Sequence, residues 1–337
     1  MSNYRKILEY RSHLKGLAIL WVVFFHLPIT ISNTVLKFIW EIGYGGVDIF
    51  FFLSGIGVYY SLKKHSTEEF YLRRVKRIMP AYLPVVLVTF CLYNYFHWQG
   101  ISFHGMVDWM KQLTGNIFMT GWFAKANGQF NWYVQAVMWF YLIAPLLLYV
   151  IRRVSKDKWK VIGFWLIILL AQVAFFDTAL HKMPARLLVF VLGMWAAFVY
   201  EEGKREKENL CLLYVSMAVG IAILFGTYCL VPDWLSMYGL FWYPFVLIVP
   251  GLCVLWANVF GAMQKSKGTR LLINGIRCLG DASFEIYLIH ILLFEFLLKP
   301  VGISGNGQWF VAAVLAVLAG ILYKKAIACA KSKLQLA

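Results

Sequence analysis

Residues 14–28 read LKGLAILWVVFFHLP, an apolar run with a lysine near its start and a histidine near its end. Similar apolar runs recur along the chain. Their length is close to the roughly 17–25 residues that a helix needs to cross ~30 Å of hydrocarbon. Of the 337 residues, 61% are hydrophobic and 14% are charged, whereas soluble domains carry roughly 25% charged residues. Because lipid cannot hydrogen-bond an exposed backbone, the runs must be helices. The sequence therefore predicts an all-α integral membrane protein.

The spacing of these runs predicts about ten transmembrane helices. The predicted spans are 14–32, 43–60, 79–96, 131–151, 161–178, 185–200, 210–231, 241–260, 281–298 and 309–325. With the N-terminus in the cytoplasm, 26 of the 32 Lys and Arg residues fall on cytoplasmic segments and six on outer ones. The positive-inside rule then places both termini in the cytoplasm and the protein in the cell membrane. We expect residues 1–337 to form a single transmembrane domain without an appended soluble domain.

Neither the net charge nor the cysteines indicate a different class of protein. The net charge of +16 follows from the basic inner loops of a membrane protein, so we expect membrane lipid and no nucleic acid as a partner. The six cysteines are scattered, mostly inside or beside apolar runs, without the spacing of metal ligands or of a disulfide framework. We expect no metal site and no bound cofactor.

Ionisable residues inside the first two runs are the candidates for chemistry. Lys15 and His26 are eleven positions apart, so they share one helix face about 16 Å apart along the axis. Asp48 lies at a similar depth in the next run, which reads GYGGVDIFFFLSGIGVYY from residue 43. This favours a buried His26–Asp48 pair, in which the carboxylate orients the imidazole for proton transfer. The alternatives are a purely structural pair, a histidine bonded to a neighbouring helix, and a lysine that only reaches the interface.

A basic segment on the inner side precedes the third run. It reads STEEFYLRRVKRIMPAY over residues 66–82, where Ser66 and Glu69 have the spacing of a helix start and a helix to Pro80 is expected. Its cations are Arg73, Arg74, Lys76 and Arg77. One interpretation is a site for a polyanionic cytoplasmic ligand, since guanidinium groups match phosphate. The other is ordinary anchoring to lipid headgroups.

Six segments together resemble the acyltransferase family 3 membrane proteins. Lys15 and His26, with ten residues between them, are similar to the family's first-span signature, and GGVDIFFFLSGIGVYYS (45–61) is similar to its second-span motif. YLRRVKRIMPAY (71–82) resembles the inner-loop Arg-x-x-Arg segment. Three later segments follow in the family's order: NWYVQAVMWFYLIAPLL (131–147), ARLLVFVLGMWAA (185–197) and LGDASFEIYLIH (279–290).

The resemblance implies an acyltransferase that takes an acyl group, acetyl in the first instance, from cytoplasmic acyl-CoA. The acceptor would be a hydroxyl group of an envelope glycan or glycolipid. His26 would be catalytic, and we expect Asp48 to assist it. The residues expected to engage the donor are Lys15, Arg73, Arg74 and Arg77. Two positions depart from the family pattern: many members have arginine in place of Lys15, and many have acidic residues in place of Val137 and Met138.

Five further residues are candidates for lining a cavity: Ser54, Trp132, Tyr133, Glu285 and His290. Glu285 precedes His290 by little more than one turn, as an intramembrane polar pair that is either functional or a bond between helices. Trp132 and Tyr133 stand at an outer span end, where aromatic residues usually anchor the chain to the interface. Ser54 lies among glycines that also permit close helix packing.

A transporter or flippase of an anionic or lipid-linked substrate is the alternative function. It would explain the ten spans, the buried ionisable residues and the basic inner surface, but not the ordered set of motifs. The chain shows no fixed-period repeat and no pair of matching broken helices, which are features of common transporter designs. A receptor or structural membrane protein would leave the buried ionisable residues without a purpose.

Overall fold

The computed structural model describes residues 2–96, 106–121, 131–173, 182–202, 209–230 and 241–333, in which helices are joined by loops and there is no strand. The first helices are α1 (Asn3–Glu9), α2 (Arg11–Phe25), α3 (Thr34–Glu41), η1 (Ile42–Gly45), α4 (Gly46–Lys64) and α5 (Thr67–Phe96). Next come α6 (Met106–Ile117), α7 (Trp132–Val154), α8 (Lys158–Val173), α9 (Lys182–Glu201) and α10 (Leu210–Leu230). The last are α12 (Pro244–Met263), η3 (Lys267–Thr269), α13 (Arg270–Asp281), α14 (Ser283–Ile291), η4 (Leu292–Leu298) and α15 (Asn306–Lys333).

Among the described residues, seven helices are long and apolar enough to cross a membrane. They are Thr34–Lys64, Thr67–Leu92, Trp132–Val154, Met183–Glu201, Leu210–Leu230, Pro244–Met263 and Asn306–Lys333. Each overlaps one of the predicted spans, and the all-α membrane class is confirmed.

The three remaining predicted spans correspond to shorter helices. The first, 14–32, ends early because α2 stops at Phe25 and His26 caps it; Pro28 follows closely and disfavours helix in the residue before it. In the fifth, 161–178, residues 174–178 lie outside the described residues, and the helix in it is α8. The ninth, 281–298, is divided where α14 passes into the π-helix η4.

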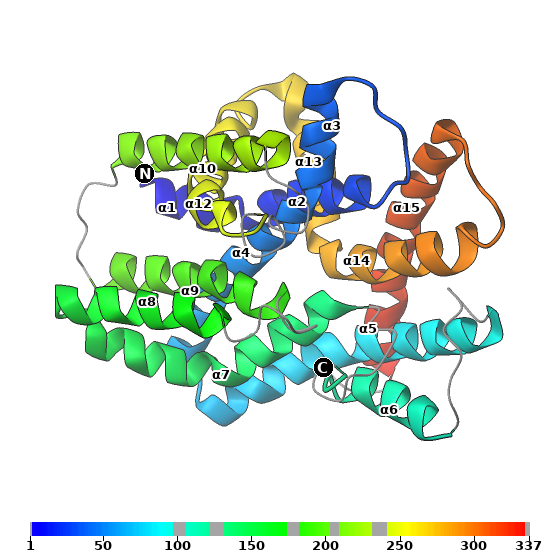
Figure 1. Ribbon diagram of the computed structural model, residues 1–337, viewed down its shortest axis with the longest axis horizontal. Coiled ribbons are helices and arrows are strands. Elements are labelled where there is room, and N and C mark those ends of the chain that lie inside the picture. The colour runs from blue at the N-terminus through cyan, green and yellow to red at the C-terminus, as the bar shows by residue number, and fades with distance from the viewer. Residues whose placement is uncertain are drawn as a thin grey trace.

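The span that contains α4 is the central helix of the bundle. In its most apolar window 78% of the residues are buried inside the protein, against 17% for α10 and for α15. Figure 1 shows α4 crossing between α7, α8 and α9 on one side and α1, α10 and α12 on the other. Close packing of α4 on α9 depends on Gly55 and Gly193, because a Cβ on either would lie 2.1 Å from a backbone carbonyl oxygen of the other helix.

Helix α5 runs through two prolines, so the predicted helix end at Pro80 is wrong. Proline has no N–H, and the carbonyl four residues earlier, that of Lys76, loses its helical partner. The ammonium group of Lys331 at the end of α15 donates to this carbonyl at 2.9 Å. A side chain of α15 therefore replaces the hydrogen bond that Pro80 cannot donate.

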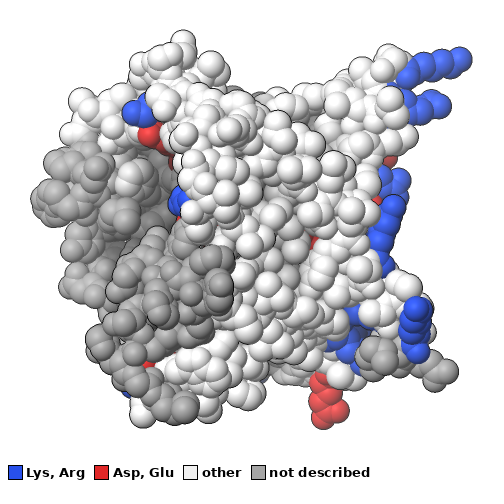
Figure 2. All heavy atoms as spheres, turned by 90° about the vertical axis from the view of Figure 1, so that its right-hand side faces the viewer, with Lys and Arg blue, Asp and Glu red and all other residues white. Residues whose placement is uncertain are grey.

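Basic side chains gather on one side of the molecule. Figure 2 shows Lys and Arg along one edge of the view, next to a broad area of other residues. Lys and Arg are expected at the ends of apolar helices, where the chain meets water, and this edge is such a surface.

Candidate active site

His26 and His290 lie side by side. His26 caps the end of α2, His290 is a fully buried residue of α14, and these two helices are in contact. The ring centroids are 5.0 Å apart, with an angle of 69° between the ring planes. The Nδ1 atom of each ring lies beside a backbone carbonyl one turn earlier, at 2.8 Å from Val22 O for His26 and at 3.1 Å from Ile286 O for His290.

These two contacts determine which ring nitrogen can act as a base. A carbonyl oxygen only accepts hydrogen bonds, so Nδ1 of each ring carries the proton and donates it, and Nε2 is the acceptor. The Nε2 atom of His290 is buried and has no hydrogen-bond partner among the described residues. A neutral imidazole in this tautomer can take a proton from a substrate at Nε2.

Asp48 pairs with Arg186 of α9 rather than with His26. Its carboxylate is fully buried, and Oδ2 lies 3.4 Å from Nη1 of Arg186, which is 2% exposed. Neither carboxylate oxygen has a hydrogen-bond partner in the part of the chain that the structure describes. The expected hydrogen-bonded His26–Asp48 pair is therefore wrong. The Val22 carbonyl orients the imidazole, and the guanidinium of Arg186 offsets the burial of the Asp48 charge.

Aromatic rings connect this ion pair with the histidines. The guanidinium of Arg186 lies 5.6 Å from the ring of Tyr44 and 5.4 Å from the ring of Trp242. The ring of Tyr44 in turn lies 5.7 Å from that of Phe25, which is 4.9 Å from the imidazole of His26. The buried ion pair and His26 thus belong to one continuous part of the core.

Four cations gather near the other end of α2: Arg11, Lys15, Arg74 and Arg77, here called the cationic cluster. The three arginines all lie within electrostatic reach of Lys15. Among the described residues, none of the four forms an ion pair with a carboxylate. Asp281 lies within electrostatic reach of Lys15 and Glu285 within reach of Arg77, so the four cations outnumber the acidic groups near them. Such an excess of positive charge suits a polyanion such as a group of phosphates.

Gly57 on α4 is the point where Arg11 and Arg74 meet. Nη2 of Arg11 donates to Leu53 O at 3.0 Å, and Nη2 of Arg74 donates to Gly57 O at 3.4 Å. A Cβ on Gly57 would lie only 2.3 Å from Nη2 of Arg11. The guanidinium of Arg74 also lies 4.9 Å from the ring centroid of Tyr141. A glycine at this position leaves room for a buried guanidinium.

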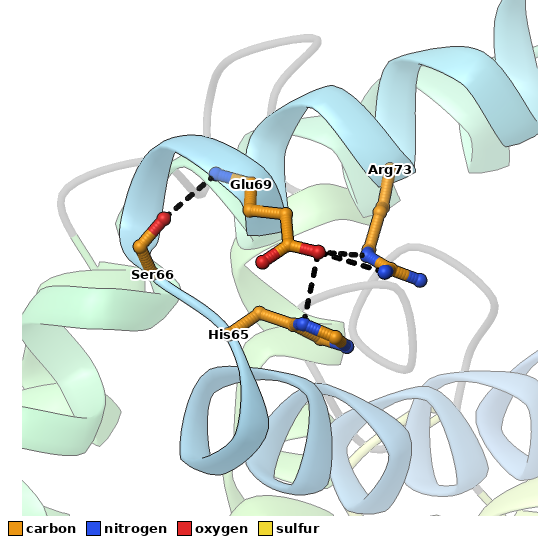
Figure 3. A network of polar contacts seen from close by, with 4 residues as sticks. All are labelled: His65, Ser66, Glu69 and Arg73. Carbon is orange, nitrogen blue, oxygen red and sulfur yellow. Dashed lines mark hydrogen bonds and ion pairs between the residues drawn. The ribbon is translucent and has the colours of Figure 1, made fainter.

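Arg73 has its own partner outside the cationic cluster. Its Nε and Nη2 atoms donate to Glu69 Oε1 at 3.0 and 2.7 Å, and its side chain is 56% exposed (Figure 3). Glu69 also faces His65, and its N–H donates to Ser66 Oγ, which confirms the predicted helix start. Consecutive helix positions point about 100° apart, so Arg73 and Arg74 cannot share a face. In the structure Arg73 is therefore engaged by Glu69 and points away from Arg74.

Tyr133 and Ser54 are linked to His290 through the ring of Tyr287. The ring of Tyr133 is 5.1 Å from that of Tyr287, which is 5.5 Å from the ring of His290. Ser54 lies near the hydroxyl group of Tyr133. Trp132 is half-buried and packs against the same core. The buried position of Tyr133 argues against a simple interface anchor.

Glu285 and His290 do not form the expected polar pair. Nδ1 of His290 donates to the backbone and Nε2 has no partner among the described residues, so Glu285 is not bonded to it. Glu285 instead lies within electrostatic reach of Arg77 in the cationic cluster. Residues five apart in a helix point about 140° away from each other, which explains the separation.

Two residues of the site, Arg11 and Arg186, were not predicted. Arg11 precedes Lys15 by four positions, a spacing that places both on one helix face. Arg186 lies within the predicted span 185–200, and a charged residue inside a span usually faces the protein interior. Both signals are present in the sequence, but neither identifies the partner.

Comparison with known proteins identifies the family of the chain. A family model described as an acyltransferase domain matches residues 10–324. The acyltransferase MdmB of Streptomyces mycarofaciens is 24% identical over 317 residues, which cover 86% of this chain and 79% of the relative. The exopolysaccharide production protein ExoZ of Rhizobium meliloti is 27% identical over 299 residues, covering 83% of this chain and 86% of the relative.

A third relative is longer than this chain. The O-acetyltransferase OatA of Staphylococcus aureus is 25% identical over 291 residues, which cover 75% of this chain but 46% of that protein. No solved structure matches the chain. Because the family match extends over nearly the whole length, the chain belongs to acyltransferase family 3 and is an enzyme that transfers acyl groups other than aminoacyl groups.

Proposed function

We propose that the chain moves an acyl group, acetyl in the first instance, from cytoplasmic acyl-CoA to a hydroxyl group of an extracytoplasmic envelope glycan. The observation that carries the proposal is the arrangement along α2. Lys15 and the cationic cluster lie near one end, and His26, with Nε2 as a proton acceptor, caps the other. Eleven residues of helix span about 16 Å, which is about the reach of the uncharged arm that links the nucleotide of coenzyme A to its thioester.

The donor phosphates bind to the cationic cluster in this proposal. Guanidinium groups bind phosphate oxygens in pairs, and Arg11 and Arg74 are held side by side at Gly57. The arm then follows α2 until the thioester carbonyl reaches His26. Acyl-CoA is a substrate here, not a bound cofactor.

His26 acts as the general base. Its Nε2 takes the proton of the acceptor hydroxyl while the hydroxyl oxygen attacks the thioester carbonyl carbon. The carbon–sulfur bond then breaks, the new ester remains on the acceptor, and the leaving thiolate receives the proton from the imidazolium. General-base assistance of this kind typically contributes about 10²–10⁴-fold to the rate.

The acceptor approaches from the side of the ion pair between Asp48 and Arg186. Both groups are buried with unused hydrogen-bonding capacity, and two aromatic rings connect them to His26. Asp48 contributes from there and not as the partner of His26. A polysaccharide hydroxyl is supported by the names of two relatives, an exopolysaccharide production protein and an O-acetyltransferase.

In the proposed topology the chain forms a single transmembrane domain of ten spans in the inner (plasma) membrane. Both termini lie in the cytoplasm. This topology adds α2, α8 and the pair α14–η4 to the seven longer helices. The one-sided distribution of Lys and Arg supports this orientation (Figure 2). A transporter or flippase is not favoured, since the relatives include named acyltransferases.

Purified protein with acetyl-CoA and isolated envelope glycans tests the proposal. We expect CoA release coupled to acetylation of the glycan, and loss of both with His26→Ala. His65→Ala is the matched control, because His65 faces Glu69 outside the site and its removal should leave transfer intact. Wild-type transfer by His26→Ala would exclude His26 as the base. Mass spectrometry of envelope glycans from cells with and without the gene identifies the acceptor.

A further inference from the structure

A cavity of about 330 Å³ lies beside the cationic cluster, between the ends of three helices. Its lining residues are Arg5, Leu8, Tyr60, Tyr200 and Glu201, here called the tyrosine pocket. Small-molecule sites occupy roughly 300–1,000 Å³, so the tyrosine pocket suits one compact group and not a whole coenzyme.

The walls of the tyrosine pocket combine flat rings with fixed polar groups. Arg5 Nε donates to the Tyr200 hydroxyl at 2.6 Å, and the Tyr60 hydroxyl donates to Glu201 Oε1 at 3.0 Å. The ring of Tyr200 is also stacked on that of Tyr4, with centroids 4.3 Å apart, which holds it in place. The pocket is therefore preorganised for a planar group.

The carboxylate of Glu201 selects for a hydrogen-bond donor. It accepts from the hydroxyl group of Tyr60 and from the ammonium group of Lys63, as an ionised carboxylate can only accept hydrogen bonds. An exocyclic amine on a heteroaromatic ring is a donor of this kind.

The tyrosine pocket is about one helical turn from the cationic cluster. Tyr60 follows Gly57 by three positions on α4, a rise of about 4.5 Å, and Leu8 precedes Arg11 by three positions. Arg11 itself lies at Gly57. A nucleobase and the phosphates of one nucleotide can thus occupy the pocket and the cluster at the same time.

We infer that the tyrosine pocket binds the adenine of the acyl-CoA donor while the cationic cluster binds its phosphates. This inference rests on the proposed function for the identity of the donor. Base–aromatic stacking accounts for roughly five- to hundredfold in affinity when the aromatic side chain is removed.

Binding of adenosine 3′,5′-bisphosphate to the purified full chain tests the pocket without any chemistry. We expect Tyr200→Ala to weaken nucleotide binding about tenfold and to leave binding of pyrophosphate unchanged. Tyr200→Phe keeps the ring and should retain most of the affinity. Tyr149→Ala is the matched control, because Tyr149 is a 56% exposed tyrosine beside Arg153 and away from the pocket. Monodisperse elution in size-exclusion chromatography confirms folding of each variant.

Turnover separates this inference from the proposed function. With acetyl-CoA, Tyr200→Ala should raise KM about tenfold, whereas with S-acetyl-4′-phosphopantetheine, which lacks the adenosine, KM should not change. Nucleotide binding by a wild-type protein that never consumes acetyl-CoA would overturn the proposed function and leave the pocket standing. Two results would contradict adenine binding in the tyrosine pocket while turnover by the wild-type protein is normal. One is a nucleotide affinity that Tyr200→Ala does not change. The other is an equal rise in KM for both donors in Tyr200→Ala.

Discussion

Replacement of Gly57 by alanine should displace the half-buried guanidinium of Arg11 and leave the fold intact. The added Cβ would lie 2.3 Å from Nη2 and 3.0 Å from Cζ of Arg11, the mobile end of a long side chain. Arg11 can move away by changing rotamers, and the helix backbone does not have to shift. Its hydrogen bond to Leu53 O, 3.0 Å long, is lost in the process.

The size of the effect follows from that displaced charge. A hydrogen bond to a charged group contributes about 1.5–3 kcal/mol, and donor phosphates held by Arg11 would lose a contact of this type. Every 1.4 kcal/mol corresponds to a factor of about ten. For Gly57→Ala we therefore expect KM for acetyl-CoA to rise about 10- to 100-fold, with a small change in kcat.

Steady-state kinetics with Gly57→Ala, Arg11→Ala and the double variant measure this effect. If the alanine acts through Arg11, the double variant should resemble Arg11→Ala alone, since coupled residues are not additive. Gly55→Ala is the matched control: its Cβ would meet the carbonyl oxygen of Phe190 at 2.1 Å, and backbone cannot give way. That variant should lose about 1–3 kcal/mol of stability through overpacking.

Two results would refute the reasoning. An unchanged KM in Gly57→Ala would show that the position of Arg11 does not matter to the donor. Effects of Gly57→Ala and Arg11→Ala that multiply in the double variant would show that the alanine acts through something else.

Three further predictions concern the histidines, the buried ion pair and the basic segment. His290→Ala should lower kcat about tenfold or more without changing KM for acetyl-CoA, and an unchanged kcat would remove His290 from the active site. Arg186→Met should lower the free energy of unfolding by about 3–5 kcal/mol, because it leaves a buried carboxylate unpaired, and adding Asp48→Asn should restore much of it in thermal unfolding. Arg74→Ala should raise KM for acetyl-CoA, whereas Arg73→Ala should not, because Arg73 is paired with Glu69. Equal effects of the two variants in a titration with acetyl-CoA would contradict binding of the donor by the cationic cluster.

Several site residues could be placed on the correct helices from the sequence, but their partners could not. His26 and Asp48 have matched depths in neighbouring runs, and this depth argument predicted a pair that the structure does not form. Asp48 faces Arg186, and His26 faces His290, because α9 and α14 pack beside α4 and α2. Depth along a helix follows from residue number, whereas the direction of a side chain depends on which helix packs beside it.

The amino-acid sequence by itself determined that the chain is a helical membrane protein with one strongly basic side. Long apolar runs admit only helices in lipid, and charges at their ends follow the surface of the membrane, so both properties are local. Only the structure decided the tautomer of His26, the partner of Asp48, the partner of Arg73 and the tyrosine pocket beside the cationic cluster. The partner of Asp48 and the tyrosine pocket depend on contacts between helices far apart in the chain, and hydropathy carries no information about which helices meet. The tautomer of His26 and the partner of Arg73 depend instead on a contact four residues earlier in the same helix, which only the orientation of the side chain reveals.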